Sequence, residues 1–313
     1  MAKFAVICLA GPSSEELRRL NNLLESLFFW EPATSLVVLI DDSPPVRDLA
    51  ALLPPVLKGK LVVLPNPLAG RGHYWDRGVA GMMAGLSHLA TLTEIEFVVK
   101  VDTDALVIAP FANRVGRIFA DNSAVGQVGA YNPSWYDHSP LNPMRRLSMP
   151  VRAWRKAGFP GFWLETALAG RAGEVRGYAI AARRSGYRPG SHVLGGGNAI
   201  SAQAISQMAS GGFFDQPQFW LGHQMIEDLL LSMLVRSVGL ECFDDSGNGG
   251  IFGVAGRGLP GTPQQMLDRS HAIIHAVKND PNHSEEQIVD FFRRFRVGGG
   301  ENRDALETVG AKS

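Results

Sequence analysis

Short apolar runs alternate with amphipathic helical segments through the first hundred residues, and this pattern constrains the fold more than any other feature. Residues 4–9, 36–40, 61–64 and 97–101 have the pattern of buried strands, because each is a short apolar run bounded by polar or turn residues. Strands that alternate with helices form a parallel sheet covered on both faces. We therefore expect an α/β fold with a mostly parallel central sheet flanked by helices.

Two amphipathic helices are predicted between these strands. The segment from Ser13 to Glu16 has the capping-box pattern, in which a hydroxyl accepts from the helix start and an acid three residues later reaches back. Apolar residues then recur at helical spacing, at Leu17, Leu20, Leu24, Leu27 and Phe28. A glycine-marked loop over 70–73 leads into a second apolar stripe, at Trp75, Val79, Met82, Leu86 and Leu89.

The regular alternation ends at Tyr131, and this sets the expected organisation of the chain. The segment that follows is rich in proline, tryptophan, arginine and glycine, which is typical of an irregular or partly helical insertion. We expect one domain over 1–297, built from a first half, an insertion and a second half at 1–131, 132–190 and 191–297. Residues 298–313, glycine-rich and then polar, are expected to form a flexible tail.

Composition excludes several classes of protein. The chain has 313 residues, of which 45% are hydrophobic, so it can build a sizeable core. Its 30 basic and 30 acidic residues cancel, and we expect no nucleic-acid partner. No apolar stretch approaches the roughly 20 residues that span a bilayer. Cys8 and Cys242 both lie in apolar runs, which indicates buried free thiols, a reducing compartment and a cytoplasmic location.

One stretch of the chain is strongly basic. Residues 144–188 contain ten arginines and lysines against two acids, with tryptophan and phenylalanine interleaved. Three explanations stay open: a solvated face, a peripheral contact with an anionic membrane surface, or a grip on a phosphorylated or lipid-diphosphate acceptor. The aromatic residues make the last two worth testing, because such side chains stack on sugars or lie at membrane interfaces.

Two carboxylates stand at the end of the fourth predicted strand. Asp102 and Asp104 are separated by one residue, so in extended backbone both side chains point to the same side. Open α/β sheets bind ligands at the carboxyl ends of their strands. Carboxylate oxygens suit Mg²⁺ or Mn²⁺, which commonly bridge carboxylates and diphosphate oxygens. An isolated triplet of this kind can also be a solvated strand end, so its context decides.

The context is a series of short blocks in a fixed order. The blocks are Phe97-Val98-Val99-Lys100-Val101-Asp102-Thr103-Asp104, then Gly195-Gly196-Gly197-Asn198-Ala199-Ile200-Ser201, then Glu227-Asp228, then His275-Ala276-Val277-Lys278. In this order the chain resembles a GT-A fold glycosyltransferase with an Asp-x-Asp motif, and in particular the inverting Fringe-like and β1,3-galactosyltransferase group. The resemblance implies a GT-A fold with a nucleotide-binding first half and an acceptor-binding second half.

The resemblance also implies an activity. Enzymes of this kind move a sugar from a nucleotide diphosphate, most often a UDP-sugar, to an acceptor hydroxyl with Mn²⁺ or Mg²⁺. The acceptor could be a saccharide, a lipid-linked molecule or a protein. Two other functions stay open: a sugar-nucleotide nucleotidyltransferase and a noncatalytic carbohydrate-binding protein of the same fold. The first is expected to carry a Gly-x-Gly-x-x-x-Arg loop after its first strand, where this chain has Ala10-Gly11-Pro12.

The metal and donor residues follow from matching the blocks. The resemblance implies Asp104 as a direct metal ligand, Asp102 on the metal or the donor ribose, and His275 as the last protein ligand. It implies Lys278 as a contact to the diphosphate. His271 lies four residues before His275, but the segment lacks the glutamate of the zinc metalloprotease motif, which disfavours that chemistry.

The remaining site residues are assigned in the same way. Asp228 is implied as the base that deprotonates the acceptor hydroxyl, with Glu227 as the alternative, and such a base would invert the sugar. Their structural alternative is that acids in the first turn oppose the helix dipole. Gly196 and Gly197 are implied to shape the sugar and acceptor site. Three further acids are expected near the nucleotide, although strand ends and helix starts also favour acids: Asp41, Asp42 and Asp76.

Overall fold

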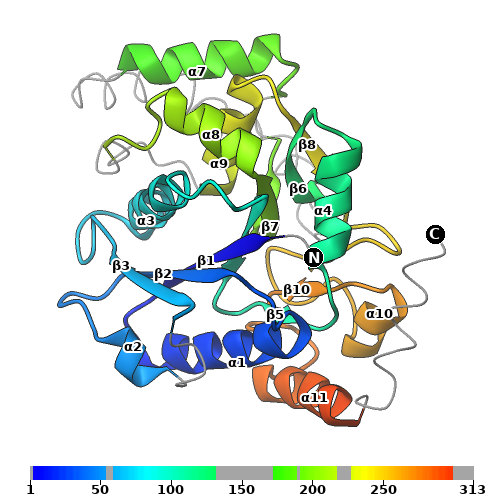
Figure 1. Ribbon diagram of the computed structural model, residues 1–313. Coiled ribbons are helices and arrows are strands. Elements are labelled where there is room, and N and C mark those ends of the chain that lie inside the picture. Colours follow the sequence, from blue (N-terminus) through cyan, green and yellow to red (C-terminus); the bar gives the residue numbers. More distant parts are fainter. Residues whose placement is uncertain (1–2, 54–58, 132–171, 189–190, 217–226, 299–313) are drawn as a thin grey trace.

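The computed structural model describes residues 3–53, 59–131, 172–188, 191–216 and 227–298 (Figure 1). Residues 132–171 of the expected insertion, with most of the basic stretch, lie outside this part, as does the expected tail beyond Gly298. The first half contains β1 (Phe4–Ala10), α1 (Ser14–Trp30), β2 (Leu36–Asp41), α2 (Leu49–Leu52), β3 (Leu61–Pro65), α3 (Tyr74–Leu89) and β4 (Phe97–Asp102). All four predicted strands and both predicted helices are therefore confirmed.

The later part of the chain is a mixture of short strands and helices. Its strands are β5 (Leu106–Val107), β6 (Val125–Tyr131), β7 (Val193–Ser201), β8 (Glu241–Asp244), β9 (Phe252–Val254) and β10 (Ile273–His275). Its helices are α4 (Ala112–Asp121), α7 (Ala172–Arg184), α8 (Ala202–Ser210), α9 (Glu227–Ser237), α10 (Pro263–Asp268) and α11 (Glu285–Gly298).

The central sheet is mostly parallel, as expected. Its seven strands have the order β3-β2-β1-β4-β7-β6-β8. The pairs β3–β2, β2–β1, β1–β4 and β6–β8 are parallel, and only β7 runs antiparallel to both of its neighbours. The chain order reverses between β1 and β4, which makes their carboxyl ends the topological switch point where ligands of open α/β sheets bind.

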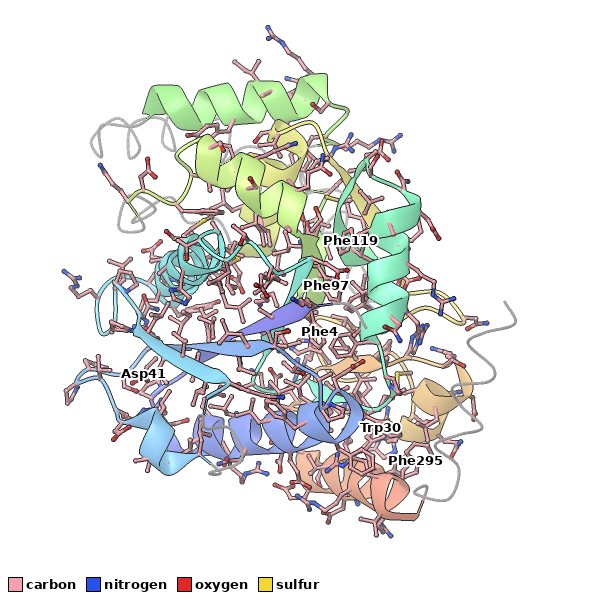
Figure 2. All side chains as sticks on the ribbon, viewed as in Figure 1. Phe4, Trp30, Asp41, Phe97, Phe119 and Phe295 are labelled. Carbon is pink, nitrogen blue, oxygen red and sulfur yellow. The ribbon has the colours of Figure 1, made fainter. Side chains whose placement is uncertain are left out.

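Both faces of the sheet are buried under helices (Figure 1). Alternate residues of β1 point to opposite faces of the sheet. Phe4, Val6 and Cys8 belong to a core cluster that includes residues of α1. Ala5 and Ile7 belong to a second cluster, which includes residues of α3, α8 and α9. Phe4 stacks on Phe97 of β4 with ring centroids 5.4 Å apart (Figure 2). A strand buried on both faces has a continuous apolar sequence, which explains why the sequence pattern located β1, β2 and β4.

A second, three-stranded sheet has the order β5-β10-β9 and follows directly from the end of β4. Strand β5 begins two residues after Asp104 and pairs antiparallel with β10, so that Leu106 lies opposite Ile274. The backbone N–H of Val277 also donates to the carbonyl oxygen of Asp104 at 3.0 Å. This sheet therefore brings the segment around His275 back to the end of β4.

The start of α1 differs from the expected capping box. Ser13 does accept from the backbone N–H of Glu16 at 3.1 Å, but the Glu16 carboxylate does not reach back to it. Instead that carboxylate accepts from the hydroxyl of Thr103 and pairs with Arg19 at 2.8 Å. The prediction was wrong for Glu16 because a tertiary contact competes with the local one, and the contact ties α1 to the turn between Asp102 and Asp104.

The state of the two cysteines and the apolarity of the helices bear on two of the expectations from composition. Both Cys8 and Cys242 are free thiols, and burial raises the pKa of Cys8 above its ordinary range and that of Cys242 to about 12. Among the described residues, no helix is both long enough and apolar enough to cross a membrane.

Candidate metal centre and acidic pair

Three predicted metal residues meet at the end of β4. Asp102 is the last residue of the strand, Asp104 follows in a turn closed by the hydrogen bond from Ala105 N–H to the Asp102 carbonyl at 3.1 Å, and His275 ends β10. The His275 Nε2 atom lies 3.3 Å from Asp104 Oδ1 and 3.6 Å from Asp102 Oδ2. One ligand atom from each residue lies within 4.8 Å of the other two, so the three can converge on one ion.

The chemistry of this cluster fits a divalent cation. Asp104 is fully buried, and within the described part of the chain its carboxylate oxygens have only contacts of 3.3 Å, from Oδ1 to His275 Nε2 and from Oδ2 to Lys278 Nζ. The other ring nitrogen of His275, Nδ1, donates to the carbonyl oxygen of Ala255 at 3.0 Å, which leaves Nε2 as the ligating nitrogen in the neutral ring. Carboxylates suit Mg²⁺ and Mn²⁺, and the added imidazole favours a first-row transition ion, so Mn²⁺ fits the whole set.

Cationic groups keep the Asp104 carboxylate ionised. Burial by itself would raise the pKa of this carboxyl, but two neighbours hold it well below the ordinary range. They are His275 in its protonated form, which is distinct from the neutral form that binds a metal, and Lys278, whose Nζ atom lies 3.3 Å from Oδ2. The pKa of His275 is raised. Burial by itself would lower it, but the negative charges of Asp104 and Asp102 outweigh that effect. Lys278 is partly exposed, as a contact to a soluble anion requires.

A buried lysine that the sequence reasoning missed links this cluster to α9. The Lys100 Nζ atom donates to Asp102 Oδ1 and to the carbonyl oxygen of Gly195, both at 2.6 Å, and lies 3.6 Å from Glu227 Oε1. Burial by itself would lower the lysine pKa, but Asp102, Glu227 and Asp228 raise it far above the ordinary value. The signal that could have found it is a charged residue in the middle of a buried apolar strand, where lysine is rare unless paired.

The predicted acidic pair faces this lysine. Glu227 and Asp228 are the first two described residues of α9. Burial, and then the neighbouring Asp228, raise the pKa of Glu227 to about 7, while Lys100 lowers it. Burial likewise raises the pKa of Asp228, and Lys100 opposes the shift. The charges of Asp102 and His275 act on Asp228 as well, so the acidic pair and the metal cluster belong to one electrostatic site.

The glycine run forms the wall between the two groups. Gly195, Gly196 and Gly197 lie in β7, the antiparallel strand inserted next to β4. A methyl group on Gly195 would overlap the Asp228 carboxylate, and one on Gly196 would overlap the His275 ring. Gly197 faces the second sheet, where a Cβ atom would lie 2.9 Å from Ile273. The structure thus places Gly196 and Gly197 against the metal cluster and its supporting sheet.

The acids that end β2 are engaged by the chain itself. Asp41 is fully buried and accepts from the Ser43 hydroxyl at 2.7 Å and from the Arg47 guanidinium at 2.8 Å. Burial would raise its pKa, but Arg47 and Ser43 lower it. Asp42 pairs with Arg77 at 2.9 Å, and burial raises its pKa in spite of that partner.

Two further residues singled out in the sequence occupy structural positions. Asp76 closes a capping box at the start of α3, where one carboxylate oxygen accepts from the His73 N–H at 3.2 Å. Its other oxygen is buried and makes no hydrogen bond within the described ranges. His271 is not part of the cluster of potential metal ligands found in the described residues. Its Nδ1 atom instead forms a hydrogen bond with the carbonyl oxygen of Gly250 at 2.9 Å.

Comparisons with known proteins give only distant likenesses. No protein-family model matches the chain, and no curated protein matches its sequence. The fold is similar to that of core-mannan synthase A from Aspergillus fumigatus in its Mn/GDP form, at 12% identity and a TM-score of 0.41, over 78% of this chain and 70% of that one. It is also similar to the galactosyltransferase LgtC in complex with donor and acceptor sugar analogues, at 12% identity and a TM-score of 0.44, over 94% and 95%. Likenesses this distant carry no argument about the reaction, which has to be inferred from the site.

Proposed function

We propose that the chain is a metal-dependent glycosyltransferase that moves a sugar from a nucleotide diphosphate donor, a UDP-sugar, to an acceptor hydroxyl. The observation that carries the proposal is the convergence of Asp102, Asp104 and His275 at the carboxyl end of β4. This end lies at the switch point of the sheet, where nucleotides bind in open α/β folds. Asp104 is fully buried, and its two oxygens face only His275 and Lys278 among the described residues, which supports a position for a cation beside this carboxylate.

The proposal assigns a role to each group around the donor. Asp102, Asp104 and His275 would hold Mn²⁺ or Mg²⁺. A cation held there would stabilise the negative charge that develops on the diphosphate as its bond to the sugar breaks. Lys278 lies beside Asp104 and supplies a further positive charge within reach of the same diphosphate.

The nucleotide is proposed to lie over the ends of β1 and β2. Because both oxygens of Asp41 are taken by Ser43 and Arg47, its role there is indirect: Arg47 also donates to the Gly11 carbonyl at 2.8 Å and so shapes the loop after β1. Asp42 and Asp76 are the carboxylates proposed to contact the ribose or the base. The oxygens of Asp42 contact Asn66 and Arg77, but this side chain is 15% exposed, whereas Asp41 is fully buried. One oxygen of Asp76 makes no hydrogen bond among the described residues.

The chemical step is proposed to use Asp228 as base. The acceptor oxygen attacks the anomeric carbon, the bond from that carbon to the diphosphate oxygen breaks, and the hydroxyl proton passes to the carboxylate. Burial raises the pKa of Asp228, which makes the carboxylate a stronger base, and the charge of Lys100 limits this rise and so favours the ionised form that can accept the proton. A single displacement of this kind inverts the sugar. Glu227 is the alternative base, and its pKa of about 7 suits proton transfer near neutral pH.

The rest of the chain is assigned to the acceptor. We propose that 1–297 forms one catalytic domain, in which 191–297 and the insertion 132–190 contact a saccharide, lipid-linked or protein acceptor. The basic stretch 144–188 would bind a phosphorylated acceptor or an anionic membrane surface. Free cysteines in β1 and β8 fit a reducing, cytoplasmic setting for this activity.

A donor screen tests the proposal. Release of nucleotide diphosphate is measured with a panel of nucleotide sugars, with Mn²⁺ or with a chelator. We expect Mn²⁺-dependent release from a UDP-sugar and its loss in Asp104→Asn. Absence of turnover and of metal-dependent nucleotide binding would favour the noncatalytic carbohydrate-binding protein. Pyrophosphate formation from a nucleoside triphosphate and a sugar phosphate would favour the nucleotidyltransferase. The anomeric configuration of the product, read by NMR, tests inversion.

A further inference from the structure

Lys100 occupies a position where oxygen atoms from three elements converge. Its ammonium contacts a carboxylate oxygen of Asp102 on β4 and the carbonyl oxygen of Gly195 on β7, and it faces the carboxylate of Glu227 on α9. The side chain is 1% exposed, so these groups replace water around the charge. Carboxylate and carbonyl oxygens are also the ligands that hard divalent cations take in proteins.

Asp102 stands between this ammonium and the metal cluster. Its Oδ1 atom is 2.6 Å from Lys100, whereas its Oδ2 atom is 3.6 Å from the ligating nitrogen of His275. A carboxylate that turns one oxygen to each of two positive charges is the link found between the ions of two-metal sites. Here the positive charge beside Asp102 Oδ1 is the ammonium of Lys100, in the place where a two-metal site has its second ion.

We propose that Lys100 is a built-in counter-cation that occupies the place of a second divalent ion and limits the site to one metal. The inference rests on the proposed function, because it takes the cluster of Asp102, Asp104 and His275 as the first metal position. It makes Lys100 a positioning residue, which commits one oxygen of Asp102 to the ammonium and leaves the other for the metal.

The charge balance of the site explains why a cation must be present. The carboxylates of Asp102 and Glu227 lie 2.6 Å and 3.6 Å from the Lys100 ammonium, and buried carboxylates without a positive partner are strongly unfavourable. An ammonium is a compact point charge with three donors, so it satisfies oxygen atoms from several directions. Loss of the lysine leaves an anionic, oxygen-lined position beside the first metal.

Manganese stoichiometry is the direct test. Mn²⁺ is titrated calorimetrically into wild type, Lys100→Ala and Lys3→Ala; Lys3 is an exposed lysine that pairs with Glu94 and serves as the matched control. We expect one Mn²⁺ per chain in wild type and Lys3→Ala and two in Lys100→Ala, with the second lost again in Lys100→Ala/Glu227→Gln. Two ions in wild type, or one ion of unchanged affinity in Lys100→Ala, would overturn the proposal.

A measurement without metal separates this inference from the proposed function. In metal-free buffer, Lys100→Ala should lower the apparent melting temperature by roughly 10 °C, because it leaves buried carboxylates unpaired. Lys100→Ala/Glu227→Gln should recover a large part of that loss, so the two changes should be strongly non-additive. If wild type binds no Mn²⁺, the proposed function is wrong. If the melting-temperature shifts of Lys100→Ala and Glu227→Gln are additive, the role proposed for Lys100 is wrong whether or not Mn²⁺ binds.

Discussion

Gly196 lies so close to the imidazole of His275 that a methyl group on its Cα atom would overlap the ring. The glycine is in the middle of a seven-stranded sheet, where it contributes nothing to side-chain packing. Glycine in a strand interior often marks a place where another group approaches closely. In β7 that group is the side chain proposed to complete the metal site.

Replacement of this glycine should therefore damage metal binding before it damages the fold. We expect Gly196→Ala to displace His275 and to weaken Mn²⁺ binding by about 10- to 100-fold, the range seen when groups that orient a ligand are changed. Calorimetric titration measures the effect. The control is Gly177→Ala on α7, where no atom lies within 4 Å of the added methyl group and stability should rise by about 0.5–1 kcal/mol. Unchanged Mn²⁺ affinity in Gly196→Ala would contradict this account of the glycine run.

The acidic pair can be resolved by kinetics. We expect Asp228→Asn to reduce the transfer rate by about 10²- to 10⁴-fold, the usual contribution of a positioned base, and to leave the affinity for nucleotide unchanged. Glu227→Gln is the matched comparison, because it removes the neighbouring charge that faces Lys100. Steady-state rates at saturating donor distinguish the two. A larger loss in Glu227→Gln than in Asp228→Asn would assign the base to Glu227.

Asp41 should matter for stability and for its pH dependence. Its pKa in the folded protein is lowered by Arg47 and Ser43, although burial opposes them. The stabilisation is therefore present above the ordinary pKa of 3.8 and is lost as the pH falls through the lower, folded value. We expect Asp41→Asn to cost about 2 kcal/mol at neutral pH, because the half-buried Arg47 and the buried Ser43 lose a charged hydrogen-bond acceptor, and less in strongly acidic buffer.

Denaturant unfolding at neutral and acidic pH measures this difference. The control is Asp290→Asn, since Asp290 pairs with Arg293 on the surface and such a pair contributes about 0–1 kcal/mol. An equal loss for both variants would show that the Asp41–Arg47 contact is no stronger than a surface ion pair.

The parallel half of the sheet could be predicted from the sequence because its signals are local. Strands β1, β2 and β4 are buried on both faces, and the half-buried edge strand β3 is still a short apolar run. The helices between them carry apolar stripes at helical spacing. The carboxylates at the end of β4 then follow from strand direction alone. His275 was placed with them by resemblance, and the structure does bring it to Asp104.

The rest depended on long-range contacts that no local pattern reveals. Glycine is depleted in strands, so the run at 195–197 did not indicate that β7 is an interior strand of the sheet, between β4 and β6. Strands β9 and β10 have three residues each, too few to show a period. Lys100 looked like an interruption of an apolar strand, and only the partners from β7 and α9 explain its charge.

Asp104 is proposed to hold a divalent cation that would also bind the diphosphate of the donor, and one calorimetric experiment tests this role most directly. UDP is titrated into wild type and Asp104→Asn, with and without saturating Mn²⁺. We predict that Mn²⁺ strengthens UDP binding to wild type and has no such effect on Asp104→Asn, whose fold is verified by circular dichroism. If the affinity of wild type for UDP does not depend on Mn²⁺, or if Mn²⁺ raises the affinity equally in both proteins, Asp104 does not have this role.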